Sequence, residues 1–383
     1  MIHRIITTAF KTAACCLTIA CLVYIYYSFG AARLAPPHDI IRHLKSNDSP
    51  PVSDNEIYTD TTVASPGSIR ELSTSKARIT IPVMIIFNNV ATQQSNLANK
   101  FRIMIESLLK LSANSTQIEL YLIADAQSFK IATAVLKSLS EKLHKVSLAK
   151  LHHVHSDQIG NDIQRRLSIK LLSYFRYKPD AYYGTALFFL SLVAHDIPAF
   201  STLSRVILLD ADLKFRSDIQ LLYQLFNEFN STQLIGMAHE ASPVYRHVFA
   251  KFRNQNGNGG NGQRVGSPPP EGHPGFNSGV LLLDLDKIRA DQTFQKLINE
   301  QQVERMANKY SFKGHLGDQD FHTLASMDYP EYYYVLPCSW NRQLCQWWRN
   351  HGSYAHVFGE YFKCDEPWIH VYHGNCNTRI PDD

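Results

Sequence analysis

The sequence lacks the patterns that would assign it to several common functional classes. It contains no Gly-x-x-x-x-Gly-Lys phosphate loop, which argues against a nucleoside triphosphatase. No long basic run occurs, and 38 Lys and Arg residues against 34 Asp and Glu residues give no sign of nucleic-acid binding. The 7 cysteines form no Cys-x-x-Cys pair, which argues against a zinc site. No internal repeat is visible, and the mildly positive net charge of +4 still allows an anionic small-molecule substrate.

Charged residues are missing from one further stretch, residues 12–32. This uncharged and largely apolar run has the length that spans a bilayer. Arg4 and Lys11 precede it, so the positive-inside rule predicts a cytosolic tail of residues 1–11 and a lumenal remainder. A cleaved signal peptide is the alternative, but the long apolar core and three tyrosines near its end favour an uncleaved signal anchor. The sequence therefore predicts a single-pass type II membrane protein.

The residues after the predicted anchor divide into a stem and a globular domain. Residues 33–78 carry many Pro, Ser, Thr and Asp residues and little apolar periodicity, which predicts a flexible lumenal stem. Residues 79–383 show regular apolar periodicity and form the predicted globular domain. The domain contains four cysteines, Cys338, Cys345, Cys364 and Cys376. An even set in a lumenal chain predicts two disulfides, while the three ways of pairing them stay open.

Apolar periodicity predicts alternating strands and helices in this domain. Strands are expected at residues 81–87, 118–124 and 146–154, with helices at 97–109 and 129–144. This order predicts a mostly parallel, doubly wound α/β sheet. Further helices are expected at 162–176, 182–195, 219–229 and 291–309, and further strands at 234–238 and 280–283. Residues 254–275, rich in Asn, Gly and Pro, are expected to form a mobile surface loop that packs no core.

An apolar run at residues 206–209 is followed by two carboxylates, Asp210 and Asp212. Unpaired charges at the end of a buried strand are costly, and open α/β sheets bind ligands just beyond the carboxyl ends of their strands. A divalent cation would neutralise both acids, and a histidine from a distant strand would complete a ligand set suited to Mn²⁺. The alternative is a pair of solvated acids in a turn. Asp284 and Asp286 form a second Asp-x-Asp, which shows how little the pattern means alone.

Two glycine-containing motifs follow, at residues 275–279 before an apolar strand and at residues 317–320 before a short helix. Glycines beside a strand allow the backbone to approach a ligand closely, whereas Asp318 could simply be a helix N-cap. A metal ion that holds a diphosphate would stabilise it as a leaving group, which is the chemistry of glycosyl transfer from a nucleotide sugar.

Four motifs in order resemble those of the glycogenin-like family of retaining glycosyltransferases. They lie at residues 206–213, 276–279, 317–320 and 373–374. Residues 187–191 and 373–378 resemble more closely the branch of this family formed by the xyloside α-1,3-xylosyltransferases. The resemblance covers residues 79–383, and it implies a single GT-A type nucleotide-diphospho-sugar transferase domain.

The resemblance also implies roles for individual residues. It implies a Mn²⁺ site, which Mg²⁺ could also occupy, formed by Asp210, Asp212 and His373. His370 competes with His373 for the ligand role, and we favour His373. The residues implied to contact the substrates are Ile86, Phe87, Asn88, Ala211, Phe276, Asn277, Ser278, Gly279, Asp318, Gln319, Gly374 and Asn375. Among these, Ile86, Phe87 and Asn88 would contact the uridine, and Asp318 and Gln319 would lie near the donor sugar.

The activity implied by the resemblance is transfer of xylose from UDP-xylose. The acceptor would be the xylose of a xylosyl-glucose disaccharide O-linked to EGF-like repeats, as on Notch, in the endoplasmic reticulum or the Golgi. A sister transferase that uses UDP-glucose or UDP-galactose, or that acts on O-glucose, is the first alternative. An inactive lumenal protein that binds EGF-like repeats and a nucleotide-sugar hydrolase are alternatives from other classes.

Two points of chemistry stay open at this stage. Gln319, an amide and a poor nucleophile, lies where a double displacement would need a carboxylate, so we favour front-face substitution with Asp318 as the fallback nucleophile. Most of the broader family also follows the metal histidine with Lys-Pro-Trp, whose lysine meets the phosphates. This chain has Asn375-Cys376-Asn377 instead, and Arg379, Asn375 or backbone amides are candidates to replace that lysine.

Overall fold

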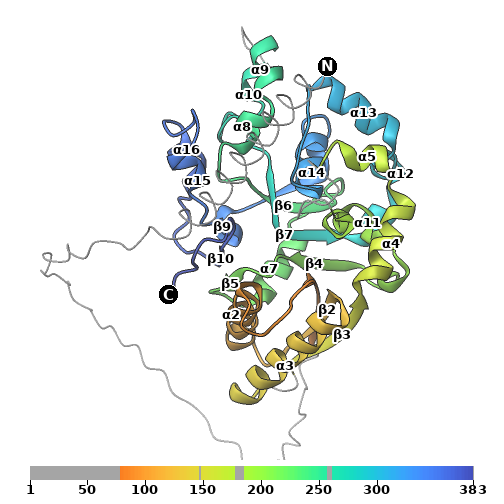
Figure 1. Ribbon diagram of the computed structural model, residues 1–383, viewed down its shortest axis with the longest axis vertical. Coiled ribbons are helices and arrows are strands. Elements are labelled where there is room, and N and C mark those ends of the chain that lie inside the picture. Colours follow the sequence, from red (N-terminus) through yellow and green to blue (C-terminus); the bar gives the residue numbers. More distant parts are fainter. Residues whose placement is uncertain (1–77, 146–147, 177–184, 257–260, 383) are drawn as a thin grey trace, which may run out of the picture. The chain divides into compact units, whose positions relative to one another are not determined.

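The computed structural model of the protein describes residues 78–145, 148–176, 185–256 and 261–382 (Figure 1). The predicted tail and anchor, and the predicted stem up to residue 77, lie outside the described residues. Within the described ranges, no helix is long and apolar enough to cross a membrane. The anchor at residues 12–32 therefore stays a prediction.

Three parallel strands and two helices form the first part of the domain. β1 (Ile79–Ile86) pairs with β2 (Thr116–Ala124), which in turn pairs with β3 (Ala149–His155). They are connected by α2 (Asn96–Leu111) and α3 (Ala126–Lys142). Each helix begins after a residue whose side-chain oxygen accepts a hydrogen bond from the first turn. The alternation predicted from the apolar periodicity is confirmed here.

The main sheet contains seven strands in the order β3-β2-β1-β4-β7-β6-β8. β4 (Arg205–Leu209) lies parallel to β1, and β7 (Phe276–Asp284) runs antiparallel to both β4 and β6 (Ile235–His239). β8 (Tyr333–Leu336) lies at the edge, parallel to β6. The predicted, mostly parallel α/β sheet is confirmed, with β7 running against its neighbours.

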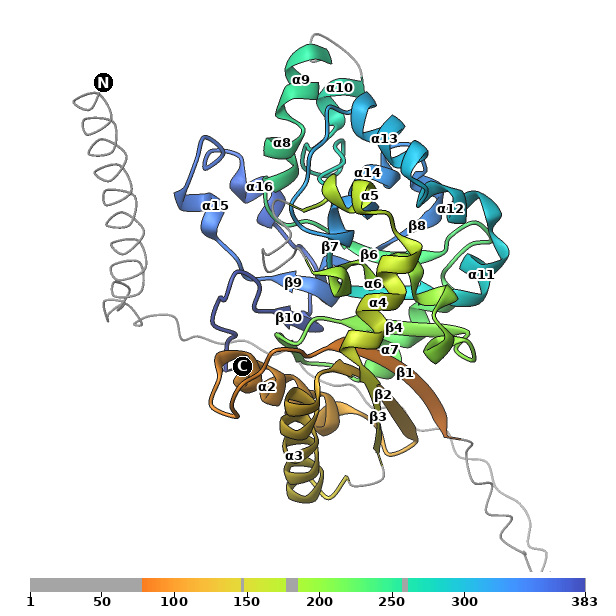
Figure 2. The same cartoon turned by 45° about the vertical axis from the view of Figure 1, so that its right-hand side comes forward.

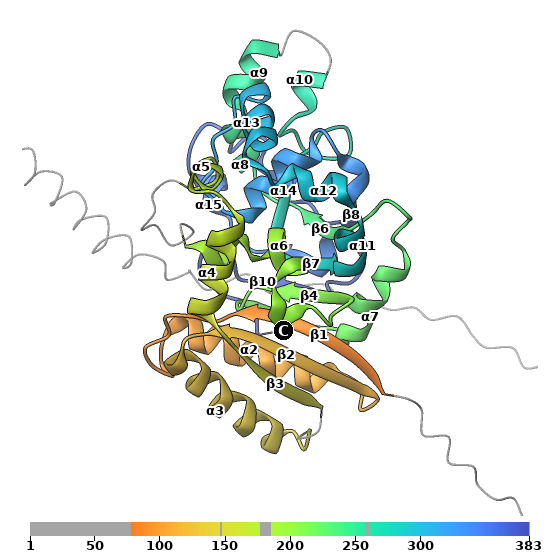
Figure 3. The ribbon, with the colours of Figure 1, turned by 90° about the vertical axis from the view of Figure 1, so that its right-hand side faces the viewer.

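The two faces of this sheet are covered by different helices. Successive side chains of a strand point to opposite faces, so Val83 and Ile85 join the cluster beneath α2 and α3. Met84, between them, joins the opposite cluster, to which α4 (Ser156–Arg166) contributes. Figure 3 shows α2 and α3 on one side of β1, β2 and β3, and α4 on the other. Because helices cover both faces, the central strands β1 and β4 are apolar along most of their length.

A second, small sheet brings the end of the chain to the acid-ended strand. β5 (Leu213–Phe215), which follows β4 almost at once, pairs antiparallel with β10 (Val371–His373). β10 also pairs with β9 (Arg342–Gln343). Figure 2 shows β9 and β10 side by side next to the main sheet. This pairing places the carboxyl end of β10 beside the carboxyl end of β4.

The remaining elements are short. They are α5 (Ile169–Ser173), η2 (Ala186–Phe189), α6 (Leu190–Val193), η3 (Ala194–Asp196), η4 (Pro198–Phe200), α7 (Ile219–Gln224), η5 (Leu225–Asn227), α8 (Val244–Val248), α9 (Ala250–Asn256), α10 (Asn261–Arg264), α11 (Leu285–Ala290), α12 (Gln292–Leu297), α13 (Glu300–Lys309), α14 (Asp318–Ser326), η6 (Pro330–Tyr332), η7 (Cys338–Asn341), α15 (Trp347–Asn350) and α16 (Phe358–Phe362).

Three predicted helices are wrong in extent. The helix expected at 162–176 is broken at Leu167, whose backbone is extended, and α5 starts anew after the capping side chain of Ser168. The helix expected at 291–309 is likewise divided into α12 and α13. The described part of 182–195 forms short turns of 3-10 and α-helix rather than one helix. In each case the apolar spacing continues across the break, so periodicity alone could not locate it.

The segment expected to be a loop without core contacts, 254–275, is ordered over its described residues. The side chain of Val265 is buried, and its backbone forms a bridge with that of His273. The guanidinium of Arg253 donates hydrogen bonds to the carbonyl oxygens of Gln263 and Val265. These contacts attach the segment to the core, which its composition did not indicate.

The four cysteines of the domain form two disulfides, Cys338–Cys364 and Cys345–Cys376. The predicted number of disulfides is confirmed, and the zinc alternative for these cysteines is wrong. The bridges join residues 26 and 31 positions apart, and closing loops of this size contributes about 3 kcal/mol each by restricting the unfolded chain. Both constrain the segment that leads to β10.

Candidate active site

Two carboxylates and one imidazole converge where β4 and β10 end. The carboxylates of Asp210 and Asp212 lie 3.4 Å and 3.3 Å from Nε2 of His373. The three potential ligand atoms all lie within 4.8 Å of one another. Two backbone contacts fix this geometry, because Asp210 N donates to Gly279 O at 2.9 Å and Gly374 N donates to Asp212 O at 2.8 Å. The structure thus brings together the three residues that the sequence resemblance implied as metal ligands.

The ring of His373 is oriented by a chain of buried side chains. Its Nδ1 lies 2.9 Å from Oδ1 of Asn341, whose Nδ2 donates to Oδ1 of Asn277 at 2.9 Å. Nδ2 of Asn277 donates in turn to Oε2 of Glu240 at 3.0 Å. Because an amide oxygen accepts only, Nδ1 of the histidine carries a proton and Nε2 faces the carboxylates. A metal ligand needs this arrangement.

The carboxylates strongly perturb the titration of the histidine. Burial by itself lowers the pKa of His373, but hydrogen bonds and charges of Asp210 and Asp212 outweigh it and raise the pKa to about 10. Burial opposes ionisation of Asp212, yet contact with His373 and Lys100 holds the pKa of Asp212 well below its usual range. Without a metal ion, the protonated ring of His373 and the ammonium of Lys100 balance the charge of these carboxylates.

His370, the competing ligand candidate, lies outside this cluster. Its ring stacks on Trp340 at 4.2 Å between centroids, and its Nδ1 lies 2.7 Å from the hydroxyl of Ser217.

The second Asp-x-Asp, Asp284 and Asp286, has structural contacts. Asp284 accepts hydrogen bonds from the backbone of α11 and from Arg205, and Asp286 pairs with Arg289. Neither acid lines the cavity described next.

The cluster of Asp210, Asp212 and His373 opens into a cavity of about 1010 Å³. This volume is at the upper end for small-molecule sites. Of the predicted substrate contacts, Ile86, Asn88, Ala211, Asn277, Ser278, Asp318, Gln319 and Asn375 line it. Phe87, Phe276, Gly279 and Gly374 do not. The ring of Phe87 is buried in the core and stacks on Phe101 at 4.4 Å between centroids, so its side chain does not reach the cavity.

Gly279 shapes the site through the close approach of the His373 ring. A β-carbon at this position would lie 2.3 Å from Cε1 of His373. Real β-carbons do not approach a heavy atom that closely, so only glycine lets the histidine ring pack against β7. The glycine therefore acts on the site through the histidine.

Asp318 and Gln319 begin α14, directly after Gly317, and both are buried against the cavity. Gly317, with a φ of +70°, occupies the cap position, so the N-cap alternative for Asp318 is wrong. Asp318 accepts a hydrogen bond from the hydroxyl of Ser191. Burial raises the pKa of Asp318 to about 7, with a smaller opposing effect from the Ser191 hydrogen bond.

The amide of Gln319 is held in one orientation from both ends. Its Oε1 accepts from Ser278 N at 3.1 Å, and its Nε2 lies 3.2 Å from the hydroxyl of Tyr245 and 3.4 Å from Oε2 of Glu240. Asp320, two positions along the chain from Asp318, is fully buried and accepts from Tyr245 and from the backbone of His315 and Leu316. Its side chain does not reach the cavity.

Three residues of the site were not identified from the sequence: Lys100, Glu240 and Asn341. Nζ of Lys100 lies 3.2 Å from Oδ2 of Asp212 and 2.9 Å from the carbonyl oxygen of Gly374. Glu240 lies two positions after the predicted strand 234–238 and directly after β6, so the rule that ligands bind at carboxyl ends could have found it. Lys100 and Asn341 carry no such local signal.

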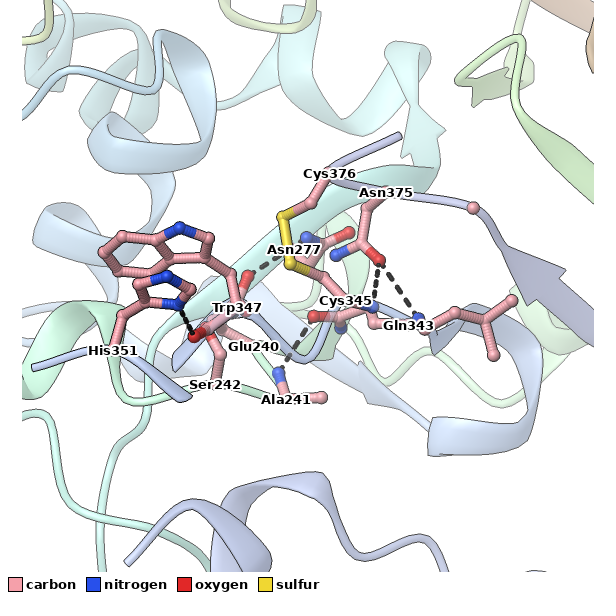
Figure 4. Close-up of a disulfide and its surroundings, with 12 residues drawn as sticks. Glu240, Ala241, Ser242, Asn277, Gln343, Cys345, Trp347, His351, Asn375 and Cys376 are labelled. Carbon is pink, nitrogen blue, oxygen red and sulfur yellow. Dashed lines mark hydrogen bonds between the residues drawn. A yellow bond between two sulfur atoms is a disulfide. The ribbon is translucent and has the colours of Figure 1, made fainter. Parts of the chain in front are cut away.

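Aromatic side chains line one part of the cavity beside a disulfide, and Figure 4 shows Trp347 and His351 next to the Cys345–Cys376 bridge. Trp347 and Trp348 both line the cavity, and the side chain of Trp347 is 49% exposed. The ring of Trp347 stacks on that of His351 at 4.5 Å between centroids. The Cys345–Cys376 bridge joins the start of this aromatic segment to the turn after the metal-binding histidine.

The comparison with known families agrees with this site. The profile of glycosyl transferase family 8 matches residues 90–361, which is most of the chain. The protein therefore belongs to glycosyl transferase family 8 and is a glycosyltransferase.

Within that class, individual relatives indicate a branch. Xyloside xylosyltransferase 1 of Mus musculus is 38% identical over 328 residues, covering 84% of this chain and 81% of the relative. The Homo sapiens protein of that name is 40% identical over 298 residues, covering 76% and 73%. The crystal structure of the mouse protein in its apo form matches with a TM-score of 0.72 and covers 79% of this chain and 100% of that one. The resemblance inferred from the sequence motifs is confirmed.

Proposed function

We propose that the protein is a retaining, Mn²⁺-dependent xylosyltransferase. It transfers xylose from UDP-xylose, in α-1,3 linkage, onto the xylose of xylosyl-glucose O-linked to EGF-like repeats of the Notch type. The observation that carries this proposal is the convergence of Asp210, Asp212 and His373 at a cavity large enough for a nucleotide sugar. The similarity to xyloside xylosyltransferases supports the choice of sugar.

The donor set fits a manganese ion. Two carboxylates and a neutral imidazole suit Mn²⁺ better than Ca²⁺ or Mg²⁺, which prefer oxygen ligands alone. The hydrogen bond from Nδ1 of His373 to Asn341 leaves Nε2 directed toward Asp210 and Asp212, where a metal would bind. When bound, the metal supplies positive charge that stabilises the diphosphate as a leaving group.

For retention we favour front-face substitution. The bond from the anomeric carbon to the diphosphate oxygen breaks, and this oxygen takes the proton of the acceptor hydroxyl as the new bond forms. Gln319 is a fixed neutral amide and cannot act as a nucleophile. Asp318 has a pKa near neutrality and accepts a hydrogen bond from Ser191, so its carboxylate is a weak competitor. A covalent sugar ester trapped on Asp318 would contradict this mechanism.

In this proposal the acceptor binds at the side of the cavity that is lined by Trp347 and Trp348. Trp347 and Trp348 offer ring faces of the kind that stack on sugars or on side chains of a protein acceptor. We place the protein in the membrane of the endoplasmic reticulum or the Golgi, held there by the predicted anchor at residues 12–32. The two disulfides are consistent with an oxidising, lumenal compartment.

The test combines the full-length protein with UDP-xylose, MnCl₂ and an EGF-like repeat that carries xylosyl-glucose. Mass spectrometry of the acceptor should show a gain of one pentose, and the gain should disappear with EDTA or with Asp212→Asn. Asp286→Asn alters the second Asp-x-Asp, outside the cavity, and should leave the gain unchanged.

The alternatives give different results in the same assay. A gain of a hexose with UDP-glucose or UDP-galactose would identify a sister transferase. Free xylose released in the presence of acceptor would identify a hydrolase. An EGF-like repeat bound without transfer, and without any need for metal, would identify an inactive binding protein.

A further inference from the structure

Lys100 lines the cavity, and the proposed function gives its positive charge no role so far. Among the described residues that line the cavity, Lys100 is the only lysine or arginine, whereas four are acids: Asp210, Asp212, Glu240 and Asp318. A nucleoside diphosphate adds further negative charge. Asp210, Asp212 and the diphosphate together carry more negative charge than one divalent metal balances, so a second positive charge is favoured beside the phosphates.

Lys100 is held where such a charge would be useful. Its ammonium lies 3.2 Å from Oδ2 of Asp212 and 2.9 Å from the carbonyl oxygen of Gly374, and its side chain is only 13% exposed. A second contact fixes the same helix, because the side-chain amide of Asn96 donates to Oδ1 of Asn377. The first turns of α2 are therefore attached to the turn that follows the metal-binding histidine.

The other candidates for the phosphate contact do not bring a charge to the cavity. Arg379 pairs with Asp382, its side chain is 84% exposed, and it is absent from the residues that line the cavity. Oδ1 of Asn375 accepts hydrogen bonds from the backbone of Leu344 and Cys345, and its amide is neutral. The backbone amide of Gly374 already donates to Asp212.

We propose that Lys100 binds the diphosphate of the nucleotide sugar and stabilises the charge that develops there as the sugar bond breaks. In the metal-free protein its ammonium balances Asp212. With a metal bound by Asp210, Asp212 and His373, Lys100 would no longer be needed to balance Asp212, and its flexible side chain would be free to donate hydrogen bonds to phosphate oxygens. No proton is transferred by the lysine in this step. The inference rests on the proposed metal-dependent use of a UDP-sugar.

Calorimetric titration of UDP into the full-length protein with MnCl₂ tests the proposal. Lys100→Met removes the charge and keeps most of the side-chain volume, and it should weaken UDP binding by about tenfold to a hundredfold. Lys100→Arg keeps the charge and should recover part of the loss. Arg379→Met should bind UDP as the wild type does. Uridine, followed by ligand-observed NMR, should bind equally to the wild type and Lys100→Met.

Manganese binding, measured by electron paramagnetic resonance, separates a phosphate contact from a structural role. Lys100→Met should bind Mn²⁺ at least as tightly as the wild type, because the competing ammonium is gone. Unchanged UDP affinity in Lys100→Met would overturn the proposal, as would an equal loss of uridine or Mn²⁺ binding. Failure of the wild type to bind UDP would instead refute the proposed function, and the inference with it.

Discussion

The ring of His373 is almost completely buried. Its orientation depends on Asn341 and Gly279, which do not line the cavity. The ring cannot rotate freely, because Asn341 contacts its Nδ1 and Gly279 lies against its edge. Metal-binding histidines commonly depend on such outer contacts for their tautomer and orientation. At the scale of single residues, the proposed metal site therefore depends on Asn341 as well as on Asp210 and Asp212.

Asn341→Ala should weaken Mn²⁺ binding by about tenfold to a hundredfold without unfolding the protein. The hydrogen bond to Nδ1 disappears, so the ring loses the contact that fixes its tautomer and its rotation. Electron paramagnetic resonance of free Mn²⁺ measures the affinity, and circular dichroism checks the fold. Asn350→Ala, at an exposed position in α15, is the matched control. Equal Mn²⁺ affinity in Asn341→Ala and the wild type would contradict this role.

A second buried histidine should make folding stability depend on pH. Burial lowers the pKa of His322 to about 3, and its Nε2 and Nδ1 contact the hydroxyls of Ser191 and Tyr333. In the unfolded chain the ring takes up a proton near pH 6.5, whereas the folded state keeps it neutral. The unfolded state binds more protons, so stability falls as the pH drops from about 6.5 toward 3.

His322→Gln should therefore show a smaller loss of stability on acidification than the wild type. The expected difference in slope approaches about 1.4 kcal/mol per pH unit well below pH 6.5. Urea unfolding between pH 7 and pH 4.5 measures it, and other titrating groups cancel in the comparison. His356→Gln, at an exposed position, serves as the control. Parallel pH profiles for His322→Gln and the wild type would refute this assignment.

At the scale of elements, the site depends on the close approach of β7 to the end of β10. β7 is the antiparallel strand between β4 and β6, and it carries Gly279 directly against the histidine ring. Any side chain there must push β10 or the ring away. The antiparallel direction of β7 thus has a functional consequence, because it presents the start of this strand, with Asn277 and Ser278, at the carboxyl end of β4.

Gly279→Ala should abolish transfer and reduce Mn²⁺ affinity at least about a hundredfold, because displacing a first ligand costs at least as much as losing its support. The added carbon would lie 2.3 Å from Cε1 of His373 and 2.5 Å from its Nδ1. Gly160→Ala is the matched control, since nothing lies within 4 Å of the added carbon in α4. That change should stabilise the protein by about 0.5–1 kcal/mol. Retained Mn²⁺ binding in Gly279→Ala would show that β10 can shift without loss.

At the scale of the whole molecule, the described residues belong to one compact unit, Ser73–Asp383. β1 lies inside its main sheet, between β2 and β4, so it cannot be removed without exposing both neighbours. The predicted boundary at residue 79 coincides with the first residue of β1. A safe boundary for the folded unit lies a few residues earlier.

A fragment of residues 73–383, secreted through an oxidising compartment, should fold and bind UDP with Mn²⁺. A fragment of residues 91–383 lacks β1 and should aggregate or be degraded, because a central strand of the sheet is missing. Size-exclusion chromatography and UDP titration distinguish the two fragments. Aggregation of the longer fragment under the same conditions would show that residues before 73 contribute to folding.

Much of this architecture was predictable because it is encoded over short distances. The strands of the first half follow from apolar runs and helical spacing, and their parallel order follows from their alternation. The paired acids at Asp210 and Asp212 were visible because a strand end and its following residues are contiguous. The number of disulfides followed from a simple count. Breaks within helices could not be predicted in this way. Leu167, for example, continues the apolar spacing, although its backbone is extended and ends α4.

Contacts between residues far apart in the chain could not be read from the sequence. Pairing of β10 with β5 brings His373, rather than His370, next to Asp210 and Asp212. The pairing of the four cysteines likewise became visible only in the folded chain. The contact of Lys100 with Asp212 spans 112 positions, and no local pattern reports it. The sequence determines which groups are available and which segments are regular. Their convergence depends on the packing of segments against one another, whose free energy is distributed over the whole core.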